Sequence, residues 1–293
     1  MKQFWILLRD AFREFRLNDP LRMAAATSFF TSFALPPIMI ILIEVFGLFG
    51  NPRVIRQDLF EQLGFIMDKN VASQVREILR NVHFLALNQG MRIGGFVFLL
   101  FVATTLFEVI KNSLNQLWKI KLRERQGAGL LFLYRAKSIG IIILAGLLFS
   151  MALLADTRGW LQPGKTGGVF YRMVTMLAMM VLSILILRYL SDGRPAWPTA
   201  VAGGIFTGLL FGVGEILLHI FLSYNSMRTI YGASTSLVLL LLFVFYCSFM
   251  FYFGACFTQA LANWKNRPIE PTRHAIRYRL KSIDYPEGGG TGK

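Results

Sequence analysis

The chain has 293 residues, of which 55% are hydrophobic and 16% are charged, whereas soluble domains usually carry about 25% charged residues. This composition excludes an ordinary soluble globular protein. The net charge of +15 would suit a nucleic-acid-binding protein, but the basic residues lie between long apolar runs, where Lys and Arg are favoured beside membranes. We therefore expect membrane lipids, with anionic headgroups at the basic loops, as partners and no nucleic acid.

Uncharged runs that are long enough to cross a membrane recur along the chain. Residues 23–43, 138–155 and 229–264 contain no charged side chain. An apolar helix of about 18 residues or more can cross a hydrocarbon core roughly 30 Å thick, and it satisfies its own backbone hydrogen bonds. The sequence predicts an all-α, polytopic integral membrane protein with six transmembrane helices. These spans are expected at about 23–49, 93–113, 133–155, 169–190, 198–222 and 235–262.

The distribution of Lys and Arg predicts the orientation of the six spans. The four segments on one side, which include both ends of the chain, together carry 21 Lys and Arg residues, whereas the three segments on the other side carry 10. Because cytoplasmic loops are enriched in Lys and Arg, this bias predicts an N-in/C-in topology.

The first 22 residues are predicted to form a cytoplasmic helix that lies in the membrane interface. Trp5, Leu8, Phe12 and Phe15 recur at helical spacing on one stripe, with arginines beside it. An amphipathic helix of this kind binds at the headgroup level. The alternative is a helix that simply packs as a cap on the bundle.

Two further segments lie outside the predicted spans, one within the membrane domain of residues 23–262 and one after it. Apolar side chains at helical spacing in residues 54–85 predict amphipathic helices on the outer face. Residues 263–293 form a basic cytoplasmic tail that is expected to be solvated.

The fifth predicted span carries a stripe of small and ionisable residues. Gly204, Gly208 and Gly212 recur every four residues and are expected to let another helix approach closely. The same stripe continues to Glu215 and His219, which are therefore expected to point into the bundle and can bond to each other. Ionisable residues within a span are functional candidates, so this pair predicts a transport or proton path. A structural polar pair that fixes helix packing is the alternative.

Gly203 is expected to lie off the glycine stripe by about 100°, so that a larger side chain is tolerated better there than at Gly208.

Other polar residues near the ends of the first two spans are weaker candidates for a transport path. Glu44 lies near the outer end of the first span, and Glu108 near the inner end of the second. Asn115 follows Glu108 at helical spacing and could line a cytoplasmic vestibule. The alternative for both carboxylates is that they simply reach water.

Catalytic motifs and metal-ligand patterns are not found in the sequence. The three histidines fall in different predicted compartments, and there is no HExxH, GxSxG or Walker motif. We expect no enzyme activity, no catalytic residues, no metal and no cofactor. The sequence does not specify an oligomeric state.

Three stretches resemble the YihY family of bacterial inner-membrane proteins, also called the virulence factor BrkB family. They are residues 23–30, residues 112–115 with Trp118, and residues 229–233, and the resemblance covers nearly the whole chain. It implies six spans, a multi-pass protein of the bacterial inner membrane, and a candidate role for Tyr231 in the transport path.

The chain departs from the family pattern after Gly254. Many members carry an acidic residue and soon an asparagine there, where this chain has Cys256 and Thr258. A mechanism that depends on that acidic group is not carried over.

Two functions remain open. The first is a transporter or exporter of a lipid or an amphipathic envelope component. Glu215 and His219 suggest that this transport is coupled to protons. The second is an envelope-integrity scaffold that transports nothing and binds partners through residues 54–85. A water-filled cavity at Glu215 would favour the first, and a closed bundle with an apolar groove outside would favour the second.

Overall fold

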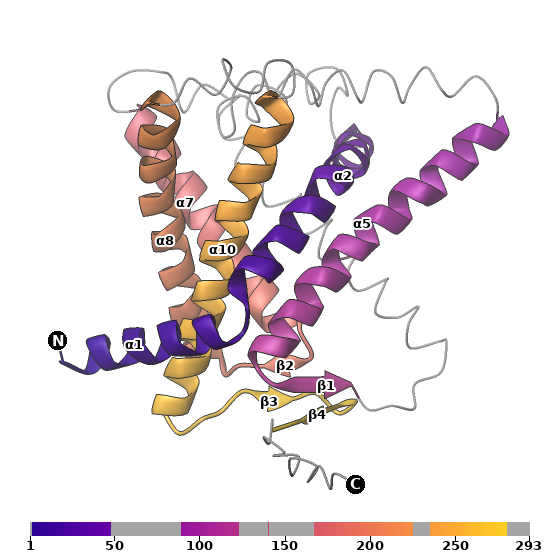
Figure 1. Ribbon diagram of the computed structural model, residues 1–293. Coiled ribbons are helices and arrows are strands. Elements are labelled where there is room, and N and C mark those ends of the chain that lie inside the picture. The colour runs from indigo at the N-terminus through magenta and orange to yellow at the C-terminus, as the bar shows by residue number, and fades with distance from the viewer. Residues whose placement is uncertain (1, 48–88, 123–139, 141–166, 225–234, 280–293) are drawn as a thin grey trace, which may run out of the picture.

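The computed structural model describes residues 2–47, 89–122, 140, 167–224 and 235–279 (Figure 1). Most of these residues are helical. Apart from Gly140, the predicted third span falls outside the described residues, and so does the predicted outer segment 54–85.

Five of the six predicted spans coincide with described helices. By length and composition alone, the stretches Trp197–Gly214 and Leu237–Trp264 are long and apolar enough to cross a membrane. The helix that covers the fourth predicted span continues without a break into a π-helix, η3 (Ile186–Leu190). The five helices are α2 (Pro20–Gly47), α5 (Gln89–Leu117), α7 (Gly167–Leu185), α8 (Trp197–Tyr224) and α10 (Thr235–Trp264).

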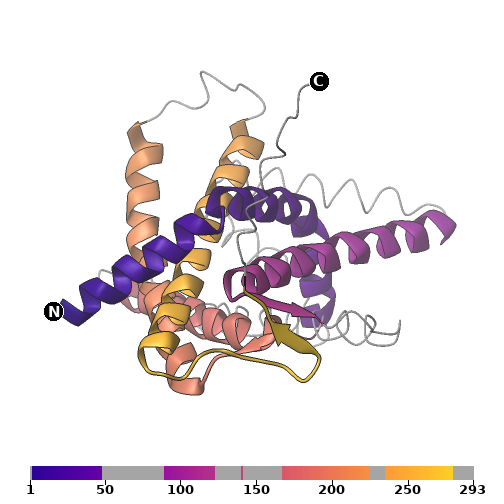
Figure 2. The same cartoon turned by 60° about the horizontal axis from the view of Figure 1, so that its bottom comes forward.

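The helices pack side by side in the order α7, α8, α10, α2, α5. The two ends of this row meet at one end of the molecule, where the end of α5 contacts η3 and the strands that follow. We call this end the foot. The described parts of α5 and α7 diverge with distance from the foot, which lies at the bottom of Figure 1 and turns forward in Figure 2.

Two short antiparallel sheets at the foot were not predicted by the sequence. The strand β1 (Ile120–Leu122) pairs with β4 (Ala275–Arg277), and β2 (Gly193–Arg194) pairs with β3 (Glu270–Pro271). The basic tail is therefore folded against the bundle as far as residue 279 rather than solvated throughout. The side chains of Ile269 and Ala275 are buried, which ties this part of the tail to the core.

The chain reverses direction at the foot through residues with left-handed backbone geometry. Lys119 follows α5 with a φ of 57°, and Asn266 follows α10 with a φ of 52°. A residue in this conformation commonly ends a helix, because it turns the chain away from the helix axis. Both turns point the following residues into the two sheets.

The helix α1 (Lys2–Leu17) lies across the lower part of α10 (Figure 1). Leu7, Ala11 and Phe15 are buried, and the ring of Phe15 meets the ring of Phe249 edge-on, with a centroid distance of 4.8 Å. The predicted stripe is therefore divided, because Trp5 and Phe12 of that stripe are 68% and 58% exposed. The buried face follows Leu7, Ala11 and Phe15, and of these only Phe15 belongs to the predicted stripe.

Glycines bring α8 close to α7 on one side. Gly204, Gly208 and Gly212 lie against Ile184, Met180 and Met176 respectively. A Cβ atom at Gly204 or Gly208 would overlap the facing side chain, whereas one at Gly212 would lie 3.3 Å from the flexible end of Met176. The contact is therefore tightest nearer the foot.

Gly203 lies on a second close contact, between α8 and α10, and the expectation that it tolerates a larger side chain is wrong. A Cβ atom there would overlap Thr258, and one at Gly254 of α10 would overlap Thr207 of α8. Each threonine hydroxyl donates a hydrogen bond of 2.8 Å to the carbonyl four residues earlier, Thr207 to Gly203 and Thr258 to Gly254. Each helix thus places a glycine against a threonine of the other. Because α8 packs between α7 and α10, it needs small residues on two of its faces.

Gly203→Ala should lower the free energy of unfolding in detergent by about 1–3 kcal/mol, because the added methyl group overlaps Thr258. Gly212→Ala is the matched control on the same helix. It should be neutral or slightly stabilising, since alanine favours a helix over glycine by about 1 kcal/mol. Thermal unfolding of both variants in one detergent measures the difference. Equal stability of the two variants would show that the close approach of α8 to α10 is not real.

Candidate functional site

A buried carboxylate lies at the foot, where α5 meets the end of η3. The side chain of Asp192 is 3% exposed, and its Oδ2 atom lies 3.1 Å from Nζ of Lys111, whose side chain is 11% exposed. The same oxygen accepts a hydrogen bond of 2.7 Å from Nδ2 of Asn115. A buried carboxylate needs such partners, because an unpaired charge in the protein interior is strongly disfavoured.

Helix geometry places the two partners from α5. Lys111 and Asn115 are four residues apart and therefore lie on one face of the helix. The side-chain oxygen of Asn115 also accepts a hydrogen bond of 2.9 Å from the backbone N–H of Asp192. Asn115 thus binds both the backbone and the carboxylate of Asp192, which fixes the orientation of its amide group.

Asp192 lies just beyond the π-helix η3. At Ser191 the backbone becomes extended, and the Ser191 hydroxyl donates a hydrogen bond of 2.9 Å to the carbonyl of Gly193. A π-helical turn is uncommon and frequently occurs at functional sites. Here the wider turn precedes the residue whose side chain reaches α5.

The tail and α10 join the same region. The backbone N–H of Thr272 donates a hydrogen bond of 2.8 Å to the carbonyl of Asp192. The indole N–H of Trp118, which is 1% exposed, donates a hydrogen bond of 3.2 Å to the carbonyl of Ala255 on α10. Asp192, Lys111 and Asn115 therefore form the centre of a contact between α5, η3 and the tail, which we call the foot clasp.

Of the residues predicted for the transport path, the structure describes the side chains of two, Asn115 and Glu108. Asn115 is part of the foot clasp, whereas Glu108, one turn before Lys111 on α5, is exposed. The side chains of the other predicted residues fall outside the described part of the structure. These are Glu44 on α2, Glu215 and His219 on α8, and Tyr231 between α8 and α10.

Sequence reasoning missed two of the three residues of the foot clasp. Lys111 stands four residues before Asn115, and Asp192 is the only carboxylate between residues 157 and 214. Asp192 could have been recognised as a candidate because it is a lone acidic residue in a basic loop. Its partner on another helix could not be read from spacing along the chain.

The foot clasp can bind α5 to η3. It has one carboxylate, one ammonium and one amide. Among the described residues, no group of three or more His, Cys, Asp and Glu side chains is placed to hold a metal ion.

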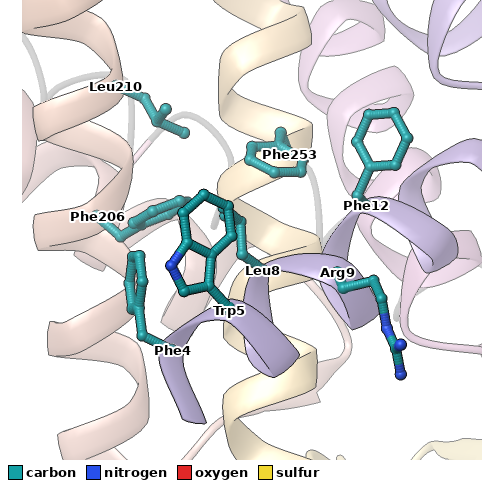
Figure 3. A pocket seen from close by; sticks show the side chains of 8 residues that line it. All are labelled: Phe4, Trp5, Leu8, Arg9, Phe12, Phe206, Leu210 and Phe253. Carbon is teal, nitrogen blue, oxygen red and sulfur yellow. The ribbon is translucent and has the colours of Figure 1, made fainter. Parts of the chain in front are cut away.

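A second feature is an apolar groove beside the foot, with a volume of about 680 Å³ (Figure 3). The helix α1 forms one wall, and α8 and α10 form the other. We call it the α1 groove. It is lined by Phe4, Trp5, Leu8, Arg9, Phe12, Phe206, Leu210 and Phe253.

Comparisons with known proteins match nearly the whole chain. A family model described as "Virulence factor BrkB" matches residues 11–277. A "UPF0761 membrane protein" of Verminephrobacter eiseniae is 26% identical over 87% of this chain and 61% of the relative. A protein of the same description from Alcanivorax borkumensis is 25% identical over 94% of this chain and 64% of the relative. One from Pseudomonas aeruginosa is 24% identical over 84% of this chain and 61% of the relative.

The chain thus spans 61–64% of the length of these curated relatives. No solved structure matches it. The comparisons support a membrane protein found in bacteria, and their names specify no substrate or activity.

Asp192→Asn should lower the free energy of unfolding by about 3–5 kcal/mol, because it leaves Lys111 buried beside a neutral partner. Glu14→Gln is the matched control, since it breaks the Lys119–Glu14 pair, also 3.1 Å long, whose side chains are 32% and 31% exposed. A partly exposed pair contributes at most about 1 kcal/mol. Thermal or denaturant unfolding in detergent measures both.

The double variant Lys111→Met with Asp192→Asn should regain much of the lost stability. It removes both charges and leaves an amide oxygen that can still accept the hydrogen bond from Asn115. Equal losses for Asp192→Asn and Glu14→Gln would contradict the burial of the foot clasp.

Proposed function

Because the chain belongs to the virulence factor BrkB family of membrane proteins, we propose that it transports a lipid or an amphipathic envelope component across the bacterial inner membrane. In this proposal it is a six-span protein with both termini in the cytoplasm, and it does not act as an enzyme.

The observation that carries this proposal is the foot clasp. It joins the two ends of the helix row, because α5 and η3 lie side by side there while α5 and α7 diverge farther away. A buried ion pair is weak evidence for stability, since apolar side chains of similar volume often stabilise a protein as well or better. Its groups can, however, exchange their partners for water when the contact opens. The foot clasp therefore suits a gate at the cytoplasmic end of a transport path.

The proposed path runs beside α8, where Glu215 and His219 follow the glycine stripe in the sequence. Histidine changes its charge near neutral pH and could pass protons to or from a neighbouring carboxylate. Opening and closing of the foot clasp would then alternate with protonation of this pair.

A non-transporting scaffold is the second candidate, and the α1 groove favours it. The groove lies on the outside of the bundle and offers an apolar surface to a partner. The foot is also densely packed, since Leu114, Leu117 and Trp118 are at most 1% exposed. A measurement of transport distinguishes the two functions.

The proposed topology is tested with single cysteines at positions 70 and 285, in a background with Cys247 and Cys256 replaced by alanine. A membrane-impermeant thiol reagent added outside intact spheroplasts should label Asn70→Cys and leave Tyr285→Cys unlabelled. Lysed membranes, in which both positions are accessible, provide the control. Labelling of position 285 in intact spheroplasts would contradict the arrangement with both termini inside.

Transport is tested with the full chain in vesicles that contain a fluorescent phosphatidylglycerol in both leaflets. Dithionite bleaches only the outer leaflet, so lipid movement appears as additional bleaching. We expect protein-dependent movement that increases with an imposed proton gradient and is lost in Glu215→Gln, which keeps the shape of the side chain and removes its charge. Glu270→Gln, the same change at an exposed position of β3 that is not a candidate for the transport path, should move lipid as the unmodified chain does.

Bleaching equal to that of protein-free vesicles, with and without the gradient, would contradict transport of this class of lipid and favour the scaffold. Movement that is unchanged in Glu215→Gln at every pH would assign Glu215 a structural role.

A further inference from the structure

The α1 groove joins apolar walls to one basic side chain. Phe206 and Leu210 of α8 and Phe253 of α10 form the wall that rises from α1, and Trp5 of α1 lies opposite (Figure 3). Arg9 belongs to the same lining, but its guanidinium group points away from Leu210 and Phe253, to the other side of α1. The groove itself is therefore apolar, and the charge of Arg9 lies just outside it, on the other side of α1.

We propose that this groove binds an anionic phospholipid, with one acyl chain along α8 and α10 and the phosphate on Arg9. The volume of about 680 Å³ lies within the roughly 300–1,000 Å³ of sites that hold small molecules. Arginine binds phosphate strongly because its planar guanidinium group offers several N–H donors to the phosphate oxygens.

The orientation of α1 fits this ligand. The helix lies across the lower part of α10, with Trp5 and Phe12 exposed, as expected of a helix in the membrane interface (Figure 1). A lipid whose headgroup lies level with α1 would extend its chains in the direction in which α8 and α10 rise. Its acyl chain would then lie on the side of α1 that faces the groove, and its phosphate on the side to which the guanidinium group of Arg9 points.

The charge of α1 favours an anionic headgroup over a zwitterionic one. Arg13 and Arg16 are exposed on the same helix as Arg9. Of the two acidic residues of α1, Glu14 is bound by Lys119 at 3.1 Å and Asp10 is exposed, so the exposed arginines outnumber the exposed carboxylate. A basic residue near an anionic membrane surface contributes about 1 kcal/mol of attraction. A phosphatidylglycerol-type lipid, with its net negative charge, therefore matches the site better than a phosphatidylcholine.

The same charge disfavours a second copy of the chain as the occupant. A symmetric dimer uses the same surface on both partners, so Arg9, Arg13 and Arg16 of one copy would face those of the other. Like charges brought together in this way repel each other. The proposed site does not depend on transport, because a scaffold could hold the same lipid.

Trp5 provides a probe within the groove. The full chain would be placed in phosphatidylcholine vesicles that contain increasing fractions of a brominated phosphatidylglycerol, whose bromine atoms quench tryptophan fluorescence on contact. The difference between the unmodified chain and Trp5→Phe isolates the quenching of Trp5. A parallel series with brominated phosphatidylcholine gives the preference for the anionic lipid.

We expect the anionic lipid to bind beside Trp5 about fivefold more strongly than the zwitterionic lipid. Arg9→Gln should reduce this ratio to near one. Arg16→Gln is the matched control, because it removes the same charge from an exposed position of α1 that does not line the groove, and it should keep most of the preference.

Three results would overturn the proposal. The first is a ratio near one in the unmodified chain. The second is an equal loss of the preference in Arg9→Gln and Arg16→Gln, which would indicate a diffuse surface charge. The third is that neither lipid quenches Trp5 and the chain forms dimers. Lipid movement can be measured in the same vesicles, so failure of the lipid site and failure of transport are separate results.

Discussion

The Asp192 carboxylate cannot remain charged in a buried position without a cation beside it, and the foot of the molecule is arranged to satisfy this requirement. Lys111 supplies the charge at 3.1 Å and Asn115 supplies a hydrogen bond of 2.7 Å, both from one face of α5. The backbone carbonyl of Asp192 accepts a hydrogen bond from Thr272 of the tail. One loop residue thus connects two ends of the helix row with the C-terminal segment, and loss of its charge would weaken its contact with Lys111 of α5.

The rest of the fold supports this junction by close helix packing. Gly203 and Gly254 let α8 and α10 approach each other, and Gly208 lets α8 approach α7. On the other side of α10, the hydroxyl groups of Tyr252 and Thr27 form a buried hydrogen bond of 2.6 Å with α2. Because α7, α8, α10 and α2 are held together in this way, a change at the foot clasp can alter the relation of α5 to η3 without unfolding the row.

The helices could be predicted from the sequence because long uncharged runs have few alternatives in a membrane. The fifth span was expected at 198–222, and α8 is Trp197–Tyr224. The glycine stripe was visible at a spacing of four residues. Gly203 was misjudged because a spacing of four residues identifies only one face of a helix, whereas α8 packs against other helices on two of its faces.

The foot could not be predicted, because its interactions join residues that are distant in the sequence. Asn115 and Asp192 are 77 positions apart, and no local pattern links them. The strands there contain only two or three residues, too few for the alternation that identifies a strand. The α1 groove likewise depends on how α1 crosses α10, which the aromatic stripe of α1 alone did not indicate.

The central claim is that the charge of Asp192 holds α5 against η3, and a distance measured across the foot tests it most directly. Spin labels at Asn112 on α5 and at Arg194 on β2, both exposed and outside the foot clasp, would report that distance by pulsed electron paramagnetic resonance. The account predicts one narrow distribution in the otherwise unmodified chain, and a second population at longer distance when Asp192→Asn is introduced. The same narrow distribution in both proteins would contradict it.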